Sequence, residues 1–173
     1  MRFLLLLPIL LAPDLSAQPR VNPGVAVQKE AMKKLEFLAG KWKGEATVQQ
    51  GPGKPIQIVQ TEEIEYRLDG TIMLIEGTGR DPESGKVVFN AVAVVSYDET
   101  RQGYAIRAYS DGRKVDSDFV VDGQTFAWGF PVGPANIRHF MKVNDKGEWE
   151  ETTTVKMGDR PEMTTVRMRL RKQ

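Results

Sequence analysis

Alternation of apolar and polar residues with a period of two runs through most of this chain, from Gly40 to the C-terminus. Such alternation is typical of β-strands that bury one face. Turn signals rich in Gly, Pro, Asp and Asn separate the alternating runs, and Asp69-Gly70 is a strong hairpin signal. The sequence therefore predicts about ten short strands, at residues 41–49, 56–68, 71–78, 86–97, 104–109, 114–121, 124–130, 135–143, 148–157 and 162–171.

Only one segment has helical periodicity. In residues 28–38 the apolar residues Met32, Leu35 and Leu38 recur at a spacing near three, and Gly40 can end the helix. Without further helices to make crossovers, neighbouring strands must pair antiparallel. Sequential hairpins favour a closed sheet, which has no exposed edges. We expect an all-β fold, an antiparallel up-and-down barrel of about ten strands with one short N-terminal helix.

The prolines are consistent with this assignment. All ten fall in the N-terminal segment or in proposed turns. Because proline cannot donate a hydrogen bond to a β-ladder, its absence from the proposed strands supports them. The prediction includes the loop 131–134, which contains two of these prolines.

The first seventeen residues have the pattern of a secretory signal. A short positive start, Met1-Arg2, precedes the apolar run 3–12, and Ala17 is a suitable last residue before cleavage. We expect residues 1–17 to be removed, 18–27 to be a flexible lead-in and 28–173 to form a single domain. The protein would then be periplasmic or secreted, with no stable membrane insertion. An uncleaved anchor is the alternative, although the apolar run is short for a membrane span.

Composition excludes several classes of function. The chain has no Cys and one His, so it lacks disulfides, a thiolate nucleophile and a multi-His metal centre. Its 24 basic and 23 acidic residues balance to a net charge of +1, which argues against a nucleic-acid partner. No nucleophile elbow, phosphate loop, HExxH motif or glycine-rich dinucleotide turn is present. We therefore predict no metal site and assign no catalytic residue, and the oligomeric state stays open.

Several short motifs occur in an order that resembles a known family. The segment 40–44, Gly-Lys-Trp-Lys-Gly, opens the first strand, and Trp128-Gly129-Phe130, Ile137-Arg138 and 147–151 follow. Over about residues 31–171 the chain resembles a bacterial family of lipocalin-like, calycin-type barrels catalogued as a domain of unknown function. That family is similar in its opening motif to nitrobindin, a ten-stranded haem barrel. The resemblance implies a calycin-type barrel with Trp42 closing one end, and it implies no reaction.

Six residues are candidates for ligand binding. Glu62 and Glu76 each share strand parity with apolar residues, so each faces either the interior or solvent at a barrel mouth. His139 shares parity with Ile137, Met141 and Val143, whereas Arg138 has the opposite parity. A charge inside a barrel must be paired or meet a polar ligand. The full set of candidates is Trp42, Glu62, Glu76, Trp128, Arg138 and His139.

Three hypotheses of function follow. The first is a barrel that binds a small apolar ligand, because Ala46, Ala91, Ala93 and Ala108 would leave free volume inside. The second is a haem-binding, nitrobindin-like barrel that acts on nitrogen oxides through His139. The third is a structural or interaction module with a filled core. Under the first and third hypotheses we expect no cofactor.

Overall fold

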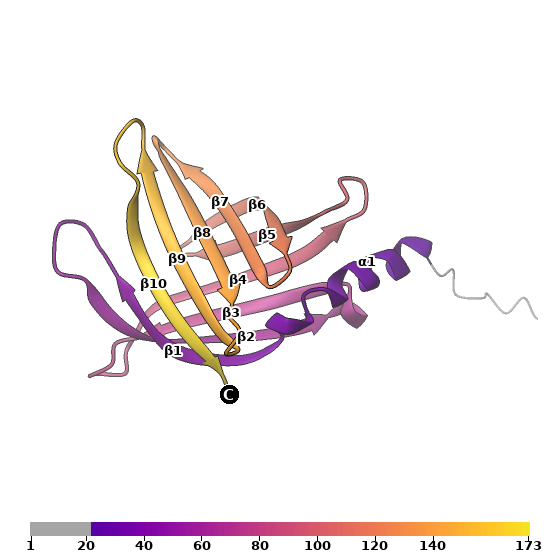
Figure 1. The fold of residues 1–173 in the computed structure, drawn as a ribbon, viewed down its shortest axis with the longest axis horizontal. Coiled ribbons are helices and arrows are strands. Elements are labelled where there is room, and N and C mark those ends of the chain that lie inside the picture. The colour runs from indigo at the N-terminus through magenta and orange to yellow at the C-terminus, as the bar shows by residue number, and fades with distance from the viewer. Residues whose placement is uncertain (1–21) are drawn as a thin grey trace, which may run out of the picture.

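The computed structural model describes residues 22–173, which form one ten-stranded antiparallel barrel with a short N-terminal helix (Figure 1). The fold class predicted from the sequence is therefore confirmed. The elements in chain order are α1 (Pro23–Lys33), η1 (Glu36–Leu38), β1 (Gly40–Val48), β2 (Ile56–Arg67), η2 (Leu68–Gly70), β3 (Ile72–Arg80), β4 (Val87–Asp98), β5 (Gly103–Ser110), β6 (Arg113–Asp122), β7 (Thr125–Val132), β8 (Ala135–Val143), β9 (Glu148–Met157) and β10 (Met163–Lys172).

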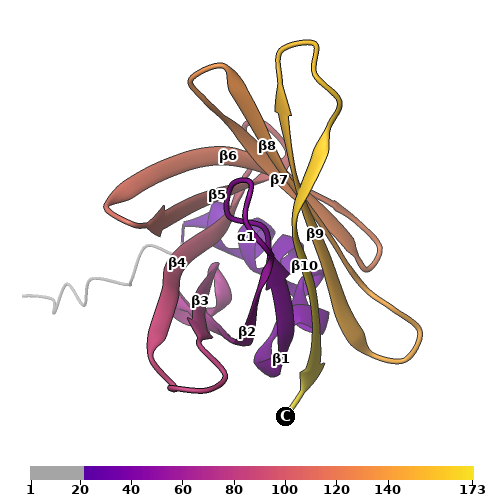
Figure 2. The ribbon, with the colours of Figure 1, turned by 90° about the vertical axis from the view of Figure 1, so that its left-hand side faces the viewer.

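The sheet closes on itself because the first strand pairs with the last. Each strand pairs antiparallel with its neighbours in the sequence, and β1 completes the circle with β10 in a register that places Gly44 opposite Leu170. Figure 2 shows β1 and β10 side by side. An up-and-down order with this closure leaves no free first or last strand.

The N-terminal helix begins earlier than the sequence pattern indicated. Helix α1 covers residues 23–33, and only a short 3₁₀ turn covers 36–38. The side chain of Asn22 accepts a hydrogen bond from the backbone N–H of Gly24, and Pro23 occupies the first helical turn, where proline is favoured. Residues 23–27 of the expected lead-in are therefore helical. The expected signal, residues 1–17, lies outside the described residues.

One end of the barrel is filled by a compact aromatic core. Trp42 is 2% exposed, and its ring meets that of Trp149 edge-on with centroids 5.8 Å apart. Its indole Nε1–H donates to the carbonyl oxygen of Leu38 at 2.7 Å, so the plug also holds η1. Phe126 also packs edge-on against Trp149, with ring centroids 5.3 Å apart. This geometry supports the role expected for Trp42, which is to close one end of the barrel.

Helix α1 is held across this closed end by two tyrosines. The Tyr66 hydroxyl donates to the carbonyl oxygen of Met32 at 2.8 Å, and the Tyr104 hydroxyl donates to that of Ala31 at 2.7 Å. These carbonyls lie in the last turn of α1, where they also accept bonds from the backbone N–H groups of Lys34 and Leu35. Each bond contributes on the order of 1 kcal/mol.

No helix among residues 22–173 has the length and apolar character that a membrane crossing needs.

The wall is incomplete between β6 and β7. These strands pair only at three positions next to their hairpin, beginning with Asp122 opposite Thr125, and Figure 2 shows them diverging from there. Farther along, the Ser117 hydroxyl donates to the carbonyl oxygen of Gly129 at 2.7 Å in place of a backbone ladder. Pro131 lies inside β7, so the prediction that no strand contains proline is wrong. The residue is tolerated because this part of β7 has no partner on the β6 side.

The opposite end of the barrel is open. Inward-facing residues near the helix, such as Met73 and Leu170, are 0% exposed. At the other end, side chains with the same inward orientation reach 38–57% exposure: Ile56, Phe89, Val132, Met157 and Met163. Solvent therefore reaches the inner surface at the end farthest from α1.

The plug predicts a large loss of stability when Trp42 is truncated. Trp42→Ala removes a buried indole and its hydrogen bond, and should lower the free energy of unfolding by about 3–5 kcal/mol. Phe140→Ala is the matched control, because Phe140 is 54% exposed on the outer face, and it should change stability by less than about 0.5 kcal/mol. Chemical denaturation measures both. Equal losses in the two variants would contradict this account of the plug.

Candidate ligand-binding site

Between the aromatic core and the open end, five polar side chains face inward at the middle of the barrel. We call them the polar layer: Gln60 and Glu62 on β2, His139 on β8, and Glu151 and Thr153 on β9. Their orientation follows from the register. Thr153 lies opposite His139, and Glu62 lies opposite the plug residue Trp42. Polar groups at this depth must be matched by hydrogen bonds or by a ligand.

Two glycines of β3 make room for the polar side chains of β2. A Cβ on Gly77 would lie 2.9 Å from both carboxyl oxygens of Glu62, and a Cβ on Gly79 would lie 2.8 Å from Oε1 of Gln60. The Gln60 amide Nε2 donates to Oε1 of Glu62 at 2.8 Å. The absence of side chains at Gly77 and Gly79 therefore leaves room on β3 for the Glu62 carboxyl and the Gln60 amide.

The carboxyl group of Glu62 is neutral at pH 7. Burial raises its pKa to about 8 because a charged carboxylate loses its hydration there. The hydrogen bond from Gln60 opposes this rise, and the negative charge of Glu151 adds to it. Glu62 therefore presents a protonated carboxyl group, held beside a second carboxylate, to the interior.

The ring of His139 is held at its Nδ1 atom. Nδ1 lies 3.3 Å from Oε1 of Glu151 and 3.0 Å from the Thr153 hydroxyl, which itself donates to Glu151 at 3.4 Å. We assign the proton to Nδ1, because the carboxylate is the strongest acceptor in reach. Nε2 then remains an acceptor, and within residues 22–173 no protein group bonds it.

An aromatic wall flanks His139. Trp128 lies opposite it in the register, and the two rings stack at 4.2 Å with an interplanar angle of 8°. Phe130 continues the stack, 5.5 Å from Trp128 and 22° from parallel. The structure therefore places polar atoms of the layer beside flat apolar faces, an arrangement typical of small-molecule sites.

The six candidates from the sequence divide into three groups. Glu62, Trp128 and His139 face the interior together. Trp42 faces inward at the closed end, where it packs in the core. Glu76 and Arg138 lie on the outer face and are exposed.

The position of Glu76 was ambiguous because β3 is apolar on both faces at Ile72–Ile75. The register decides it. Glu76 is opposite Glu63, on the face away from Glu62. Glu76 therefore faces solvent from the outer face of the wall, which is neither the interior nor the barrel mouth expected from the sequence.

Three residues of the layer were missed by the sequence analysis, namely Gln60, Glu151 and Thr153. A signal for the first was present, since Gln60 and Glu62 share parity, as do Gly77 and Gly79 on the next strand. On β9, Glu151 and Thr153 of the layer share parity with Trp149, which lies just below the layer. The buried indole Nε1 of Trp149 has no hydrogen-bond partner within the described part of the chain.

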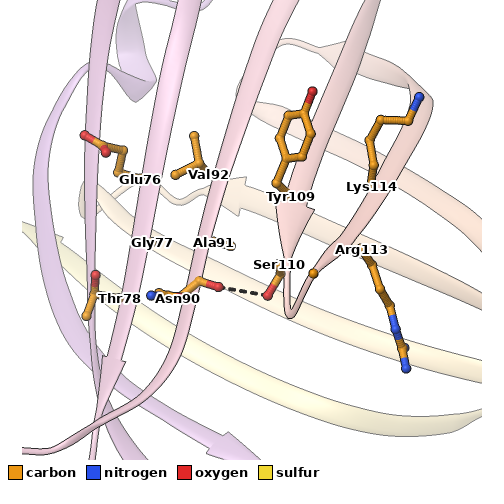
Figure 3. A pocket seen from close by; sticks show the side chains of 11 residues that line it. Glu76, Gly77, Thr78, Asn90, Ala91, Val92, Tyr109, Ser110, Arg113 and Lys114 are labelled. Atoms are coloured by element: carbon orange, nitrogen blue, oxygen red, sulfur yellow. Dashed lines mark hydrogen bonds between the residues drawn. The ribbon is translucent and has the colours of Figure 1, made fainter.

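A groove of about 620 Å³ lies on the outer face of β3–β6 (Figure 3). Figure 3 shows Glu76, Val92, Tyr109 and Lys114 side by side, one from each strand, as their register requires. A second outer groove of about 940 Å³ reaches Ser117 and Gly129 at the gap between β6 and β7. Both grooves are open to water, which can satisfy their polar groups, so neither constrains a ligand as the polar layer does.

Within residues 22–173, no three His, Asp or Glu side chains converge in a way that could hold a metal ion. The polar layer also lacks the order of a catalytic triad. Thr153 and Glu151 both bond the same atom, Nδ1 of His139, so the imidazole cannot relay a proton between them. The chemistry that this arrangement supports is recognition of a polar group by hydrogen bonds and charge.

The raised pKa of Glu62 predicts a pH-dependent stability. Between the unfolded pKa near 4.5 and the folded pKa of about 8, only the folded state keeps the proton, so the free energy of unfolding falls as pH rises through this range. Glu62→Gln removes this dependence. At pH 8 the free energy of unfolding of the variant should exceed that of the parent protein by a few kcal/mol, and at pH 5 the difference should be much smaller. Urea denaturation at both pH values measures the difference.

Glu76→Gln is the matched control, because that carboxyl is exposed on the outer wall. Its effect should be small and similar at the two pH values. If Glu62→Gln also had the same effect at both pH values, the carboxyl of Glu62 would not be neutral in the folded protein.

Comparisons with known proteins agree with the fold and go no further. No protein-family model matches the chain, and no curated protein matches it by sequence. Among solved structures, the crystal structure of Rv2717c from M. tuberculosis is similar, with a TM-score of 0.63 over 83% of this chain and 97% of that one. The two sequences are 12% identical, so this likeness shows the barrel fold alone.

Proposed function

We propose that this chain is an exported barrel that binds one small, largely apolar ligand inside its open half. The observation that carries the proposal is the exposure of inward-facing apolar side chains at the open end, where Val132 and Met157 are 39% and 38% exposed. A chain that only needed a filled core would bury these side chains, as it does at the closed end.

The depth of the site follows from the order of the layers. The rim is apolar, the polar layer lies below it, and Trp42 and Trp149 close the bottom. A ligand that enters from the rim would place its apolar part among the rim side chains and its far end against Glu62, His139 and Glu151. The alternative, a structural module with a filled core, explains the buried core of the closed half but not the exposed apolar side chains at the open end.

Export is the second part of the proposal, and residues 1–17 alone support it. The apolar run and Ala17 match a cleavable signal, and the absence of Cys is compatible with export. We assign no reaction to the barrel, because the polar layer binds and orients groups without offering an activated nucleophile.

Ligand binding can be tested with the neutral apolar dye Nile red. We expect one dye molecule per barrel, seen as a rise and blue shift of its fluorescence. Val132→Asp places a charge on the inward-facing rim and should weaken binding about fivefold or more. Val120→Asp introduces the same charge on the outer face, where Val120 is 62% exposed, and should leave binding unchanged.

The two variants decide the location of the site. Both positions are solvent-exposed, so each variant should fold, and thermal melts check this. Equal weakening by both substitutions, or no saturable binding by the parent protein, would contradict an interior site.

Haem binding through His139 remains the second candidate because Glu151 holds the ring at Nδ1. A carboxylate in this position is the usual support for a ligating imidazole, and Nε2 is free to bind iron. Against it, the Trp128 ring lies only 4.2 Å from the imidazole and occupies space that a porphyrin would need. We therefore rank haem below a smaller ligand.

A haemin titration followed in the Soret region separates these candidates. We expect purified protein to be colourless and haemin to bind weakly, with no change in His139→Ala. Stoichiometric binding that disappears in His139→Ala would reverse the ranking.

A further inference from the structure

The polar layer contains two carboxyl groups and no basic side chain that neutralises them. Glu62 and Glu151 both face the interior, and in the part of the chain that the structure describes neither forms an ion pair with Lys or Arg. Lys172 has the inward orientation on β10, but it lies over the Trp42 ring at the closed end and donates to the carbonyl oxygen of Phe37. His139 is therefore the one base in the layer.

Several hydrogen-bond acceptors in this layer have no protein donor within residues 22–173. Gln60 is 3% exposed, and its amide nitrogen is used by Glu62, while its amide oxygen accepts no bond from residues 22–173. Oε2 of Glu151 and Nε2 of His139 are likewise left without a protein donor in this range. In the described part of the chain, the one fully buried side-chain N or O atom without a partner is Nε1 of Trp149, so these acceptors are within reach of solvent and are open to a ligand that brings N–H groups.

We propose that the polar layer selects a ligand whose polar end is a protonated amine. This inference rests on the proposed function, since it assumes a ligand in the open half of the barrel. An ammonium group supplies three N–H donors and a positive charge, which match the free acceptors and the carboxyl groups.

The same charges disfavour a ligand that carries a carboxylate. A carboxylate on the ligand would lie beside the negative charge of Glu151 with no Arg or Lys to offset it, and like charges at short range repel strongly where water is scarce. A neutral alcohol would avoid the repulsion but would gain no charge interaction. The expected order of affinity for one apolar chain is therefore amine, then alcohol, then carboxylate.

A cation in this layer should also displace the proton of Glu62. The flanking positions on the neighbouring strands are Trp42 and Gly77, which do not titrate. Glu151, which is itself bonded to His139, is the titratable group whose charge acts on Glu62 within the layer. The pKa of Glu62, about 8 without ligand, falls when a positive charge binds nearby. Binding at pH 7 should therefore release close to one proton, and binding above pH 9 should release none.

The experiment compares n-octylamine, n-octanol and octanoate, which share one apolar chain and differ in charge. Isothermal titration calorimetry of the mature protein at pH 7 gives the three affinities. We expect octylamine to bind about tenfold tighter than octanol, and octanoate to bind about tenfold weaker than octanol. Repeating the octylamine titration in buffers of different ionisation enthalpy measures the proton release.

Variants test which carboxylate is responsible. Glu151→Gln should weaken octylamine binding about tenfold and leave octanol binding within about twofold. Glu76→Gln removes an exposed carboxylate on the outer wall and should change neither affinity. Glu62→Gln should abolish the proton release at pH 7. Circular dichroism and thermal melts confirm that each variant is folded.

The outcomes separate this inference from the proposed function. If octanol and octylamine bind equally well inside the barrel, the preference for an amine is wrong and the ligand-binding function stands. If octanoate binds tightest, the charge argument is reversed and the inference fails in the same way. If none of the three probes binds, both the inference and the proposed interior site are overturned.

Discussion

Hydrogen bonding between the first and last strands is the interaction on which the rest of this structure depends. It requires a glycine at position 44, where a Cβ would lie 2.0 Å from the carbonyl oxygen of Arg169 on β10. With the sheet closed, Trp42 meets Trp149 across β10, and its indole holds η1. Helix α1 then lies over the same end, tied by the hydroxyls of Tyr66 and Tyr104. The plug, the helix and the core are thus consequences of one strand pairing.

Closure also produces two unlike halves. Near α1 the inward-facing side chains are large, apolar and fully buried, so that half is a conventional core. Away from α1 the same strands carry glycine, alanine, polar residues and an exposed apolar rim. Placing the polar groups between these halves keeps them within reach of a ligand and shields them from bulk water. In the proposed site, charge differences in this layer would therefore discriminate among ligands more sharply than they could on the outer surface.

Strands with one apolar and one polar face can be oriented from the sequence, whereas strands that are apolar on both faces cannot. Where one face is apolar and the other polar, as in β8, the inward orientation of His139 was correctly predicted. In β3, four successive apolar residues give no preferred face, and the orientation of Glu76 stayed open. Pro131 was placed in a loop because a ladder would exclude it, yet it lies in β7 where the β6 side is unpaired. The start of α1 was missed because Asn22-Pro23-Gly24 is also a turn sequence. Only the packing of the helix on the barrel makes these residues begin a helix and not a turn.

The sequence by itself determined that this chain forms many antiparallel strands, because alternation with a period of two and regularly spaced turns are local properties that each strand carries alone. It also determined that disulfides are absent and that a metal site with several His or Cys ligands is ruled out, since the residues that form them are missing. Tertiary structure alone decided which polar residues meet. Glu62, His139 and Glu151 come from three strands, and their meeting depends on the closure of the barrel and on the register between neighbours. A shift of one residue in any strand would turn its polar side chain to the outer face, because successive side chains of a strand point to opposite sides of the sheet.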